Sequence, residues 1–255
     1  MMASRGKWLL VILALPIGMM FLLPGVVRGG MWVGVQTGPT YCATADVGER
    51  SWAGAGTEKT YKDVKFDVNF LGGLVVGYDF VHEGFLGRAW PSWMKYFSLV
   101  LDATYENMSF QHQGVIVEVK GKSTVSGFFP SGTFTMFSVV PMLIGKYGFI
   151  PNAEMPFGRL QPYGGVGAGI IISNSEVSNL ITRERNKLDV PLVMETGLRY
   201  MLSRNVSLDA AFRYRIIPTA FGNSYEIPGD MSHNKIDLDF KPELYNAILR
   251  VSYHF

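Results

Sequence analysis

Apolar and polar residues alternate with a period of two along most of the chain after residue 30. The segment 206–216 is the clearest: its even positions hold Val, Leu, Ala, Phe, Tyr and Ile, and its odd positions include Ser207, Asp209, Arg213 and Arg215. A helix would spread these charges around its axis, whereas a strand gathers them on one face. The pattern therefore predicts β-strands with one apolar face and one polar face.

The same alternation predicts seven further strands. The clear ones are 66–80, 97–106, 189–200 and 244–255. The weaker ones are 31–40, 133–147 and 159–173. An even number of strands returns both ends of the chain to one side, and tilted strands of about 9–11 residues span a bilayer, as in bacterial single-chain barrels.

The connections between these strands fall into two groups. With the N-terminus on the periplasmic side, the expected outer loops are 41–64, 109–132, 174–187 and 218–242. The expected inner turns are 81–93, 148–158 and 202–205. The segment 109–132 could also extend its hairpin above the membrane as an adhesive or partner-binding edge. Extra hairpins in 41–64 or 109–132 would raise the strand count to ten.

Alternation alone does not separate a membrane barrel from a soluble barrel of the lipocalin type, in which the apolar face points inward. Three features favour the membrane barrel: acids and bases at mid-strand, aromatic residues near the ends of the apolar faces, and a last strand that ends on Phe255. The mid-strand charges are Asp102, Glu195, Arg199, Asp209, Arg213 and Arg250. The aromatic residues are Phe66, Tyr78, Phe80, Phe97, Tyr105, Tyr200, Tyr214, Tyr253 and Phe255.

The expected fold is therefore all-β, an eight-stranded antiparallel transmembrane β-barrel with an up-and-down meander. The interior of such a barrel is just wide enough for side chains to fill. We therefore expect the lumen charges to pair and seal the barrel rather than line a pore. Gly165, Gly167 and Gly169 are expected on the inner face, where they would make room for large neighbours across the lumen.

The first 29 residues have the layout of a secretory signal peptide. Arg5 and Lys7 precede an apolar run at 9–23, and Pro24 and small residues follow it. A transmembrane anchor is the alternative, but a helical span needs about 20 apolar residues. We expect cleavage after Gly29, which gives a signal peptide at 1–29 and a barrel at 30–255. Later apolar stretches are too short for a helical span, so a membrane-embedded chain must cross as strands that close into a barrel.

The low fraction of charged residues and the high fraction of aromatic residues agree with a barrel whose outer surface does not face water. Charged residues make up 17% of the chain and aromatic residues 13%, whereas soluble domains carry about 25% charged residues. The net charge is +2, and no basic face indicates a nucleic-acid partner. Cys42 is the single cysteine, so it forms no internal disulfide and no cysteine-rich metal site.

Three segments resemble the last four strands of the small outer-membrane barrel superfamily: PYGGVGAGI (162–170), VSLDAAFRYR (206–215) and LYNAILRVSYHF (244–255). That group includes the OmpA-type transmembrane domain, the opacity-type adhesins and OmpW-like proteins. The resemblance implies a place in the outer membrane, contact with lipid and lipopolysaccharide, and recognition of the last strand, ending in Phe255, by the barrel-insertion machinery. Because the chain ends at the barrel, cell-wall tethering by a C-terminal peptidoglycan-binding domain is not expected.

Candidate chemistry is sparse. His82, His112, His233 and His254 have no metal-site spacing. Ser252 shares a face with His254, but at the periplasmic end, far from outer-leaflet lipid. We therefore expect no catalytic, metal or cofactor site and no enzyme activity. The expected role is structural or surface-interacting, with a possible surface ligand at the outer loops. The alternatives are a narrow pore or OmpW-like path for small apolar solutes, and a lipid-modifying enzyme.

Overall fold

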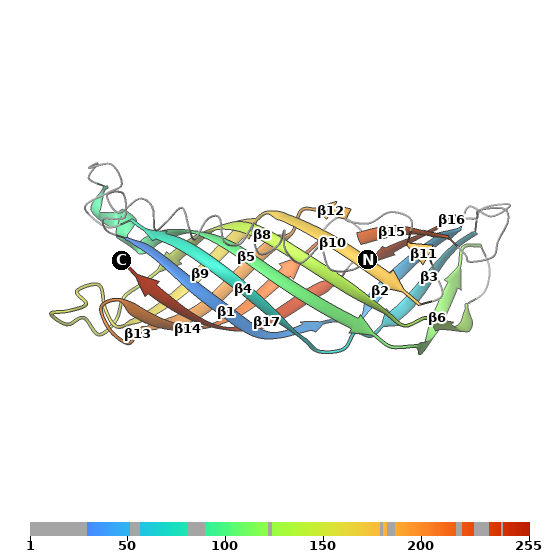
Figure 1. Cartoon of the computed structure of the whole chain (residues 1–255), viewed down its shortest axis with the longest axis horizontal. Coiled ribbons are helices and arrows are strands. Elements are labelled where there is room, and N and C mark those ends of the chain that lie inside the picture. The colour runs from blue at the N-terminus through green and yellow to red at the C-terminus, as the bar shows by residue number, and fades with distance from the viewer. Residues whose placement is uncertain are drawn as a thin grey trace, which may run out of the picture.

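The computed structural model describes residues 30–51, 57–80, 90–121, 124–178, 181–182, 187–217, 221–226, 235–240 and 242–255. Eight antiparallel rows of strands form one elongated barrel in these ranges (Figure 1). Each row consists of two or more strands that follow one another along the barrel, and we call such a row a wall. The half that contains the C-terminus is called the proximal half, and the other the distal half. The expected signal peptide, residues 1–29, lies outside the described residues.

Strands of the proximal half match the eight predicted ones. They are β1 (Met31–Cys42), β4 (Asn69–Asp79), β5 (Phe97–Phe110), β8 (Gly132–Lys146), β9 (Leu160–Ala168), β13 (Leu192–Met201), β14 (Val206–Ile216) and β17 (Glu243–His254). A 3-10 helix, η2 (Ser92–Tyr96), precedes β5. The first strand pairs with β4 on one side and with the last strand, β17, on the other. The β8–β9 pairing completes the ring, so the eight-stranded barrel is confirmed.

Most strands of the distal half lie where the sequence predicted outer loops, although β10 begins within the predicted strand 159–173. They are β2 (Ala45–Ser51), β3 (Thr57–Val64), β6 (Gln113–Val119), β7 (Val125–Phe129), β10 (Ile170–Val177), β11 (Ile181–Thr182), β12 (Lys187–Asp189), β15 (Phe221–Glu226) and β16 (Lys235–Phe240). Much of the loops predicted at 41–64, 109–132, 174–187 and 218–242 is therefore strand, and the extended hairpin considered for 109–132 is present as β6 and β7. Each distal piece continues a proximal wall, so the hairpins lengthen the barrel without adding walls.

The exterior of the proximal half is apolar, as predicted. Leu208 and Leu249 are 41% and 59% exposed, while their neighbours Ser207 and Asp209 are buried. Other exposed apolar side chains on this wall are Val35, Leu99, Leu101, Leu143, Val166, Met194, Leu198, Phe212 and Val251. An apolar band around a closed antiparallel barrel is the surface that hydrocarbon requires. The proximal half therefore spans the bilayer.

The exterior of the distal half carries charges. Cross-strand ion pairs join Lys62 to Asp46 at 2.7 Å and Lys120 to Glu58 at 2.7 Å. Lys120 holds the pKa of the exposed Glu58 carboxyl below its usual range through a hydrogen bond and its charge. Charges of this density are costly against hydrocarbon, so the distal half stands outside the membrane.

The structure differs from two predictions about single positions. Phe66 was expected on the lipid face, but it packs on the distal apolar core beside Phe110, at 5.6 Å between ring centroids. The irregular segment 65–68 and the positive φ of Asp63, 55°, interrupt the alternation there. A Cβ on Gly167 or Gly169 would lie 2.5 Å or 2.2 Å from a backbone oxygen of β8. Gly165 and Gly167 lie on the inner face as predicted, since they alternate with the exposed Val166. The space beside them is taken by the adjacent strand β8 rather than by side chains across the lumen.

The short inner turn at 202–205 is confirmed as a tight connection between β13 and β14. Residues 81–89 of another predicted turn lie outside the described part. No helix in the described ranges is long and apolar enough to cross a membrane.

Candidate functional site

Ionised side chains fill the lumen of the proximal half. Strand alternation points them inward, because each lies one residue from an outward-facing apolar side chain. All six charges predicted for the lumen are less than 5% exposed: Asp102, Glu195, Arg199, Asp209, Arg213 and Arg250. We refer to these residues and the ion pairs that join them as the plug.

Arg213 ties three walls of the barrel together. Its guanidinium donates to Asp102 on β5, across the lumen, at 2.7 Å and 3.1 Å. It also donates to Glu195, its cross-strand partner on β13, at 2.6 Å and 2.9 Å. Charge-assisted bonds of this length are the strong ones, so this arginine holds β5, β13 and β14 at fixed separation.

Two further arginines complete the central plug. Arg250 on β17 donates to Glu195 at 3.0 Å and to Gln36 on β1 at 2.8 Å. Gln36 in turn donates to Asp102 at 2.6 Å. Arg199 makes two parallel bonds to Asp209, at 3.0 Å and 2.9 Å. The first and last strands are therefore locked by side chains as well as by backbone pairing.

Additional ion pairs lie at the two ends of the plug. Lys146 contacts Asp79 at 2.7 Å at the proximal end, and Arg215 contacts Glu106 at 3.0 Å at the distal end. Lys146 was not predicted to face the lumen, because the segment 133–147 is apolar in places on both faces. Its inward position in β8 is the only signal that could have indicated a role. With these pairs, the described lumen brings together five acids and five bases.

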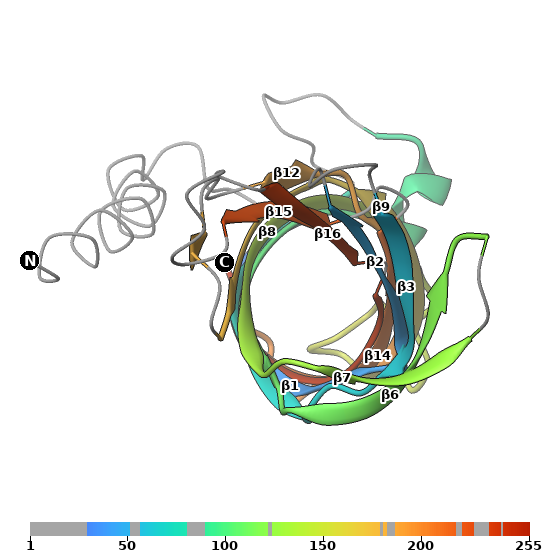
Figure 2. The ribbon, with the colours of Figure 1, turned by 90° about the vertical axis from the view of Figure 1, so that its right-hand side faces the viewer.

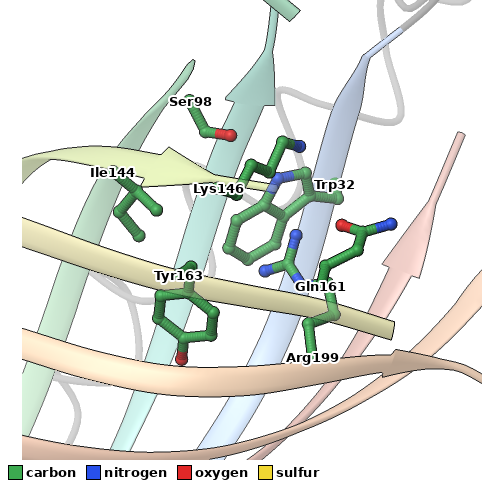
Figure 3. Close-up of a pocket in the computed structure, with 7 residues that line it drawn as sticks. All are labelled: Trp32, Ser98, Ile144, Lys146, Gln161, Tyr163 and Arg199. Carbon is green, nitrogen blue, oxygen red and sulfur yellow. The ribbon is translucent and has the colours of Figure 1, made fainter. Parts of the chain in front are cut away.

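A small void marks the proximal end of the plug (Figure 3). Its volume is about 10 Å³, and Trp32, Tyr163, Lys146 and Arg199 are among its lining residues. The Arg199 guanidinium lies 4.4 Å from the centre of a Trp32 ring. A space of roughly 10–15 Å³ holds about one water molecule, so the lumen is closed at this level.

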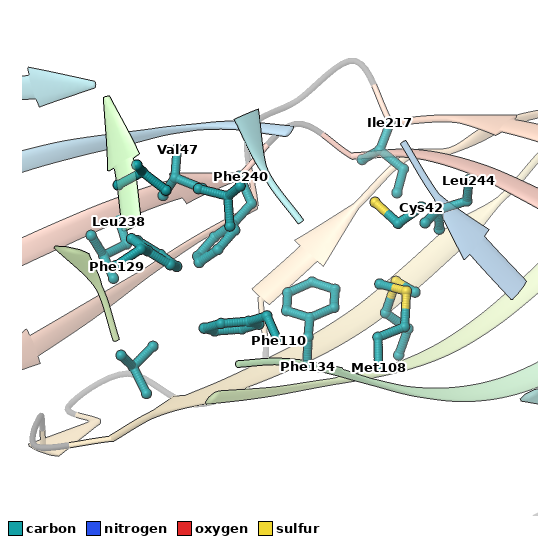
Figure 4. Packing of buried hydrophobic residues seen from close by; sticks show 14 of the residues in the cluster. Cys42, Val47, Met108, Phe110, Phe129, Phe134, Ile217, Leu238, Phe240 and Leu244 are labelled. Carbon is teal, nitrogen blue, oxygen red and sulfur yellow. The ribbon is translucent and has the colours of Figure 1, made fainter. Parts of the chain in front are cut away.

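The interior of the distal half is apolar (Figure 4). Phe110, Phe129 and Phe240 contact one another, with ring centroids 5.5–6.3 Å apart. The Arg215–Glu106 pair lies at the border with the plug, since the strand neighbours of these residues, Leu244 and Met136, belong to the apolar cluster. The lumen thus changes from charged to apolar along the barrel axis.

The hairpin β6–β7 departs from the barrel outline, which Figure 2 shows at its right-hand side. Within the described residues, β7 is an edge strand that pairs only with β6. Phe128 is 71% exposed and Ile116 is 54% exposed. His112 stacks on Phe128 at 5.3 Å. The result is an apolar edge on the part of the molecule that stands outside the membrane.

Tyr61 of β3 supports the base of this hairpin. Its ring meets Phe129 edge-on at 5.1 Å, and its hydroxyl donates to Glu49. Burial and the hydrogen bond to Glu49 raise the pKa of Tyr61. The hydroxyl therefore remains a donor at neutral pH, and the hairpin is anchored at one end.

One described histidine lies beside a serine. His254 Nε2 lies 3.0 Å from Ser207 Oγ, whereas Ser252 Oγ has no hydrogen-bond partner. His82 and His233 lie outside the described residues. No group of three potential metal ligands forms in the described part of the chain, and Cys42 is a buried free thiol.

No protein-family model matches the sequence, and no curated protein sequence matches it. Among solved structures, the outer membrane protein OprG from Pseudomonas aeruginosa has a TM-score of 0.54 at 17% identity, over 89% of this chain and 97% of that one. Neisserial surface protein A gives 0.42 at 16% identity, over 89% and 98%. The protease OmpT from Escherichia coli gives 0.38 at 8% identity, over 89% and 97%. The likeness to OprG is one of fold, and with the apolar band it identifies an outer-membrane barrel.

Proposed function

With the fold of the small outer-membrane β-barrels as the premise, we propose that this chain is a sealed anchor that presents the β6–β7 hairpin to a partner outside the cell. The role is structural and surface-interacting, in the manner of an adhesin. The single observation that carries it is the apolar edge of β7, held outside the membrane by a rigid barrel.

An open strand edge offers unpaired backbone donors and acceptors to another chain. An extended peptide that adds a strand there gains backbone hydrogen bonds, and alternate side chains supply specificity. On the outward face of this hairpin, Ile116 and Phe128 provide apolar contacts. The partner that fits is therefore an extended segment with apolar residues at alternate positions.

The plug supports an anchor rather than a pore. Its acids and bases neutralise one another in pairs that are almost fully buried. An ion that crossed this lumen would have to break several of these pairs at once. Addition of the purified protein to a planar bilayer is therefore expected to give no steady conductance at moderate voltage.

The surface role is tested by panning cells that display the chain on an immobilised library of random extended peptides. We expect enrichment of peptides with alternating apolar residues. The double variant Ile116→Ser/Phe128→Ser should lose this enrichment. Phe149→Ser removes another exposed phenylalanine, 49% exposed and on an inner turn, and should keep it. Equal recovery from cells with and without the chain would refute the surface role.

A path for small apolar solutes is the second candidate. The apolar interior of the distal half favours it, together with strand β12, which in the described ranges pairs with β10 and with neither β14 nor β15. On this reading, a solute would enter from outside and leave through the wall above the plug. Faster uptake of an apolar fluorescent dye by expressing cells, abolished by Phe134→Arg, would favour this candidate over the anchor.

Assembly of the last strand is a further part of the proposal. Phe255 and Tyr253 are both more than 40% exposed on the lipid face, and their rings meet at 5.3 Å. This terminal aromatic pair supports recognition by the barrel-insertion machinery. Lipid and lipopolysaccharide are the expected neighbours of the apolar wall.

A further inference from the structure

A cavity of about 540 Å³ opens at the proximal end of the lumen. Lys146 and Gln161 line both this cavity and the small void of Figure 3, so the cavity lies directly against the closed end of the plug. Small-molecule sites usually measure roughly 300–1,000 Å³. The proximal mouth of the barrel therefore has the size of a ligand site, and we call it the mouth cavity.

The walls of the mouth cavity come from two inner turns. One runs from the end of β4 to β5 and contributes Phe80, Trp90 and Tyr96; the other joins β8 to β9 and contributes Tyr147 and Phe157. Tyr96 stacks on Tyr147 with ring centroids 5.7 Å apart and planes within 4°. This contact joins the turns. Inner turns of outer-membrane barrels are short as a rule; here the described residues 90–96 and 147–158 contribute much of the cavity lining.

The β8–β9 turn is held in one conformation. Asn152 Oδ1 accepts the backbone N–H of Met155 at 2.7 Å, and the carbonyl of Met155 accepts the N–H of Gly158 at 3.0 Å. Gly158 has φ +121°, and a Cβ there would lie 2.4 Å from the Phe149 oxygen, so glycine is required. A wall fixed before binding costs a ligand little ordering entropy.

Flat rings and polar groups share the lining. Besides the aromatic walls, Gln161, Ser92 and His254 line the cavity. Lys146 is paired with Asp79, while the exposed Lys95 has its ammonium 5.1 Å from the centre of the Tyr96 ring. Two ammonium groups against one carboxylate leave the lining with a surplus positive charge.

We propose that the mouth cavity binds an acidic sugar of one or two pyranose rings. A pyranose ring has apolar C–H faces, which fit against aromatic rings, and hydroxyl edges, which fit the amide of Gln161 and the hydroxyl of Ser92. A carboxylate on the sugar matches the surplus charge at Lys95. The Gln161 amide already donates to the Gly158 carbonyl at 2.9 Å, so its oxygen is the atom offered to a sugar hydroxyl. An aliphatic acid of similar size has no hydroxyl to offer the Ser92 side chain or this oxygen, and burying them without a hydrogen bond is costly.

The test is titration calorimetry on the full chain in lipid nanodiscs with three probes: a disaccharide of glucuronic acid and N-acetylglucosamine, neutral chitobiose, and octanoate. We expect the acidic disaccharide to bind about tenfold more tightly than chitobiose, and octanoate to bind most weakly. Lys95→Gln should abolish the preference for the acidic sugar. Because Lys95 is exposed, this variant does not threaten folding.

Trp90→Ala should weaken binding of the acidic disaccharide about tenfold or more. Trp93→Ala is the matched control, because Trp93 belongs to the same turn, is 59% exposed and does not line the cavity. Slower migration of every variant after boiling checks that each one is folded. Absence of binding by any sugar, equal binding of octanoate, or equal losses in the two tryptophan variants would overturn the proposal. None of these results depends on the β6–β7 hairpin.

Discussion

At the scale of single residues, one step along a strand moves a side chain from hydrocarbon to a sealed ionic interior. Ser207, Leu208 and Asp209 illustrate this: the leucine faces outward, and both polar neighbours are buried. A charged side chain placed on the outer face therefore meets lipid. An apolar side chain placed on the inner face leaves a buried charge without its partner. Two predictions follow from these two environments.

Replacing Leu249 by arginine at the middle of β17 is expected to destabilise the barrel by about 2–4 kcal/mol, the cost of a cation near the bilayer midplane. Leu208→Arg on β14 should behave alike. Urea unfolding of the protein in lipid vesicles measures the difference. Ser252→Ala, on the inner face of β17, should leave stability nearly unchanged. Comparable losses in the arginine and alanine variants would contradict the facing of the wall.

Arg213→Met removes the cation that compensates Asp102 and Glu195. Breaking a buried ion pair by removing one partner costs about 3–5 kcal/mol, and we expect a loss of that size in the same unfolding assay. Lys62→Met breaks an exposed pair on the distal exterior and should change stability little. If both variants unfold at the same urea concentration as the parent, the plug does not stabilise the barrel.

The plug shows how far single residues could be predicted. Asp102, Glu195 and Arg213 were predicted to be inside, since their neighbours in sequence are apolar. Lys146 gave no such signal, because both faces of its segment contain apolar residues. Phe66 was misplaced because the alternation changes phase at 65–68, where the backbone leaves the strand. An alternating pattern therefore predicts which way a side chain faces only within one uninterrupted strand.

At the scale of elements, the strands inside the membrane are easier to predict than their continuations outside it. Hydrocarbon demands an apolar outer face, so β14 and β17 alternate strongly. The distal strands face water and mix charges with small residues; Thr57–Val64, for example, contains two lysines, a glutamate and an aspartate. Their partner strands stabilise them through cross-strand pairs, which a single segment does not reveal.

The closest approach of the first strand to the last occurs at a glycine. A Cβ on Gly38 of β1 would lie 1.7 Å from the carbonyl oxygen of Ala247 on β17. Gly38→Ala should therefore separate the two strands and cost about 1–3 kcal/mol, as overpacking does. Gly72→Ala on the adjacent strand β4 meets nothing within 4 Å and should be tolerated. The measurement is the urea concentration at which half of each variant is unfolded in lipid vesicles. Equal values for the two variants would argue against close contact at Gly38.

At the scale of the whole molecule, the barrel combines a closed hydrogen-bonded ring, an ionic plug and an apolar distal core. We expect all three to resist detergent, because the backbone hydrogen bonds lie within the wall and the ion pairs and the phenylalanines lie inside the barrel. Residues 97–110 and 132–146 illustrate the scale of the pairing, since β5 and β8 run together over the full length of β5.

We therefore expect the chain, recovered in the outer-membrane fraction of expressing cells, to migrate differently on a gel before and after boiling. The unboiled form keeps its compact barrel, and heating unfolds it. Equal migration under both conditions, or recovery in a soluble fraction, would contradict a closed membrane barrel.

Along the barrel axis, the exterior changes from apolar to charged and the interior changes from charged to apolar. This reversal constrains the order in which the barrel assembles. The distal half, with charges outside and phenylalanines inside, has the polarity of a water-soluble protein, and its folded charged exterior is costly to move through hydrocarbon. Its hairpins must therefore cross before they close, and Phe110, Phe129 and Phe240 can meet only on the far side. Once they meet, the charged exterior of the assembled distal half opposes its return through hydrocarbon. The outermost part of the barrel thus acts as a latch that makes insertion one-way.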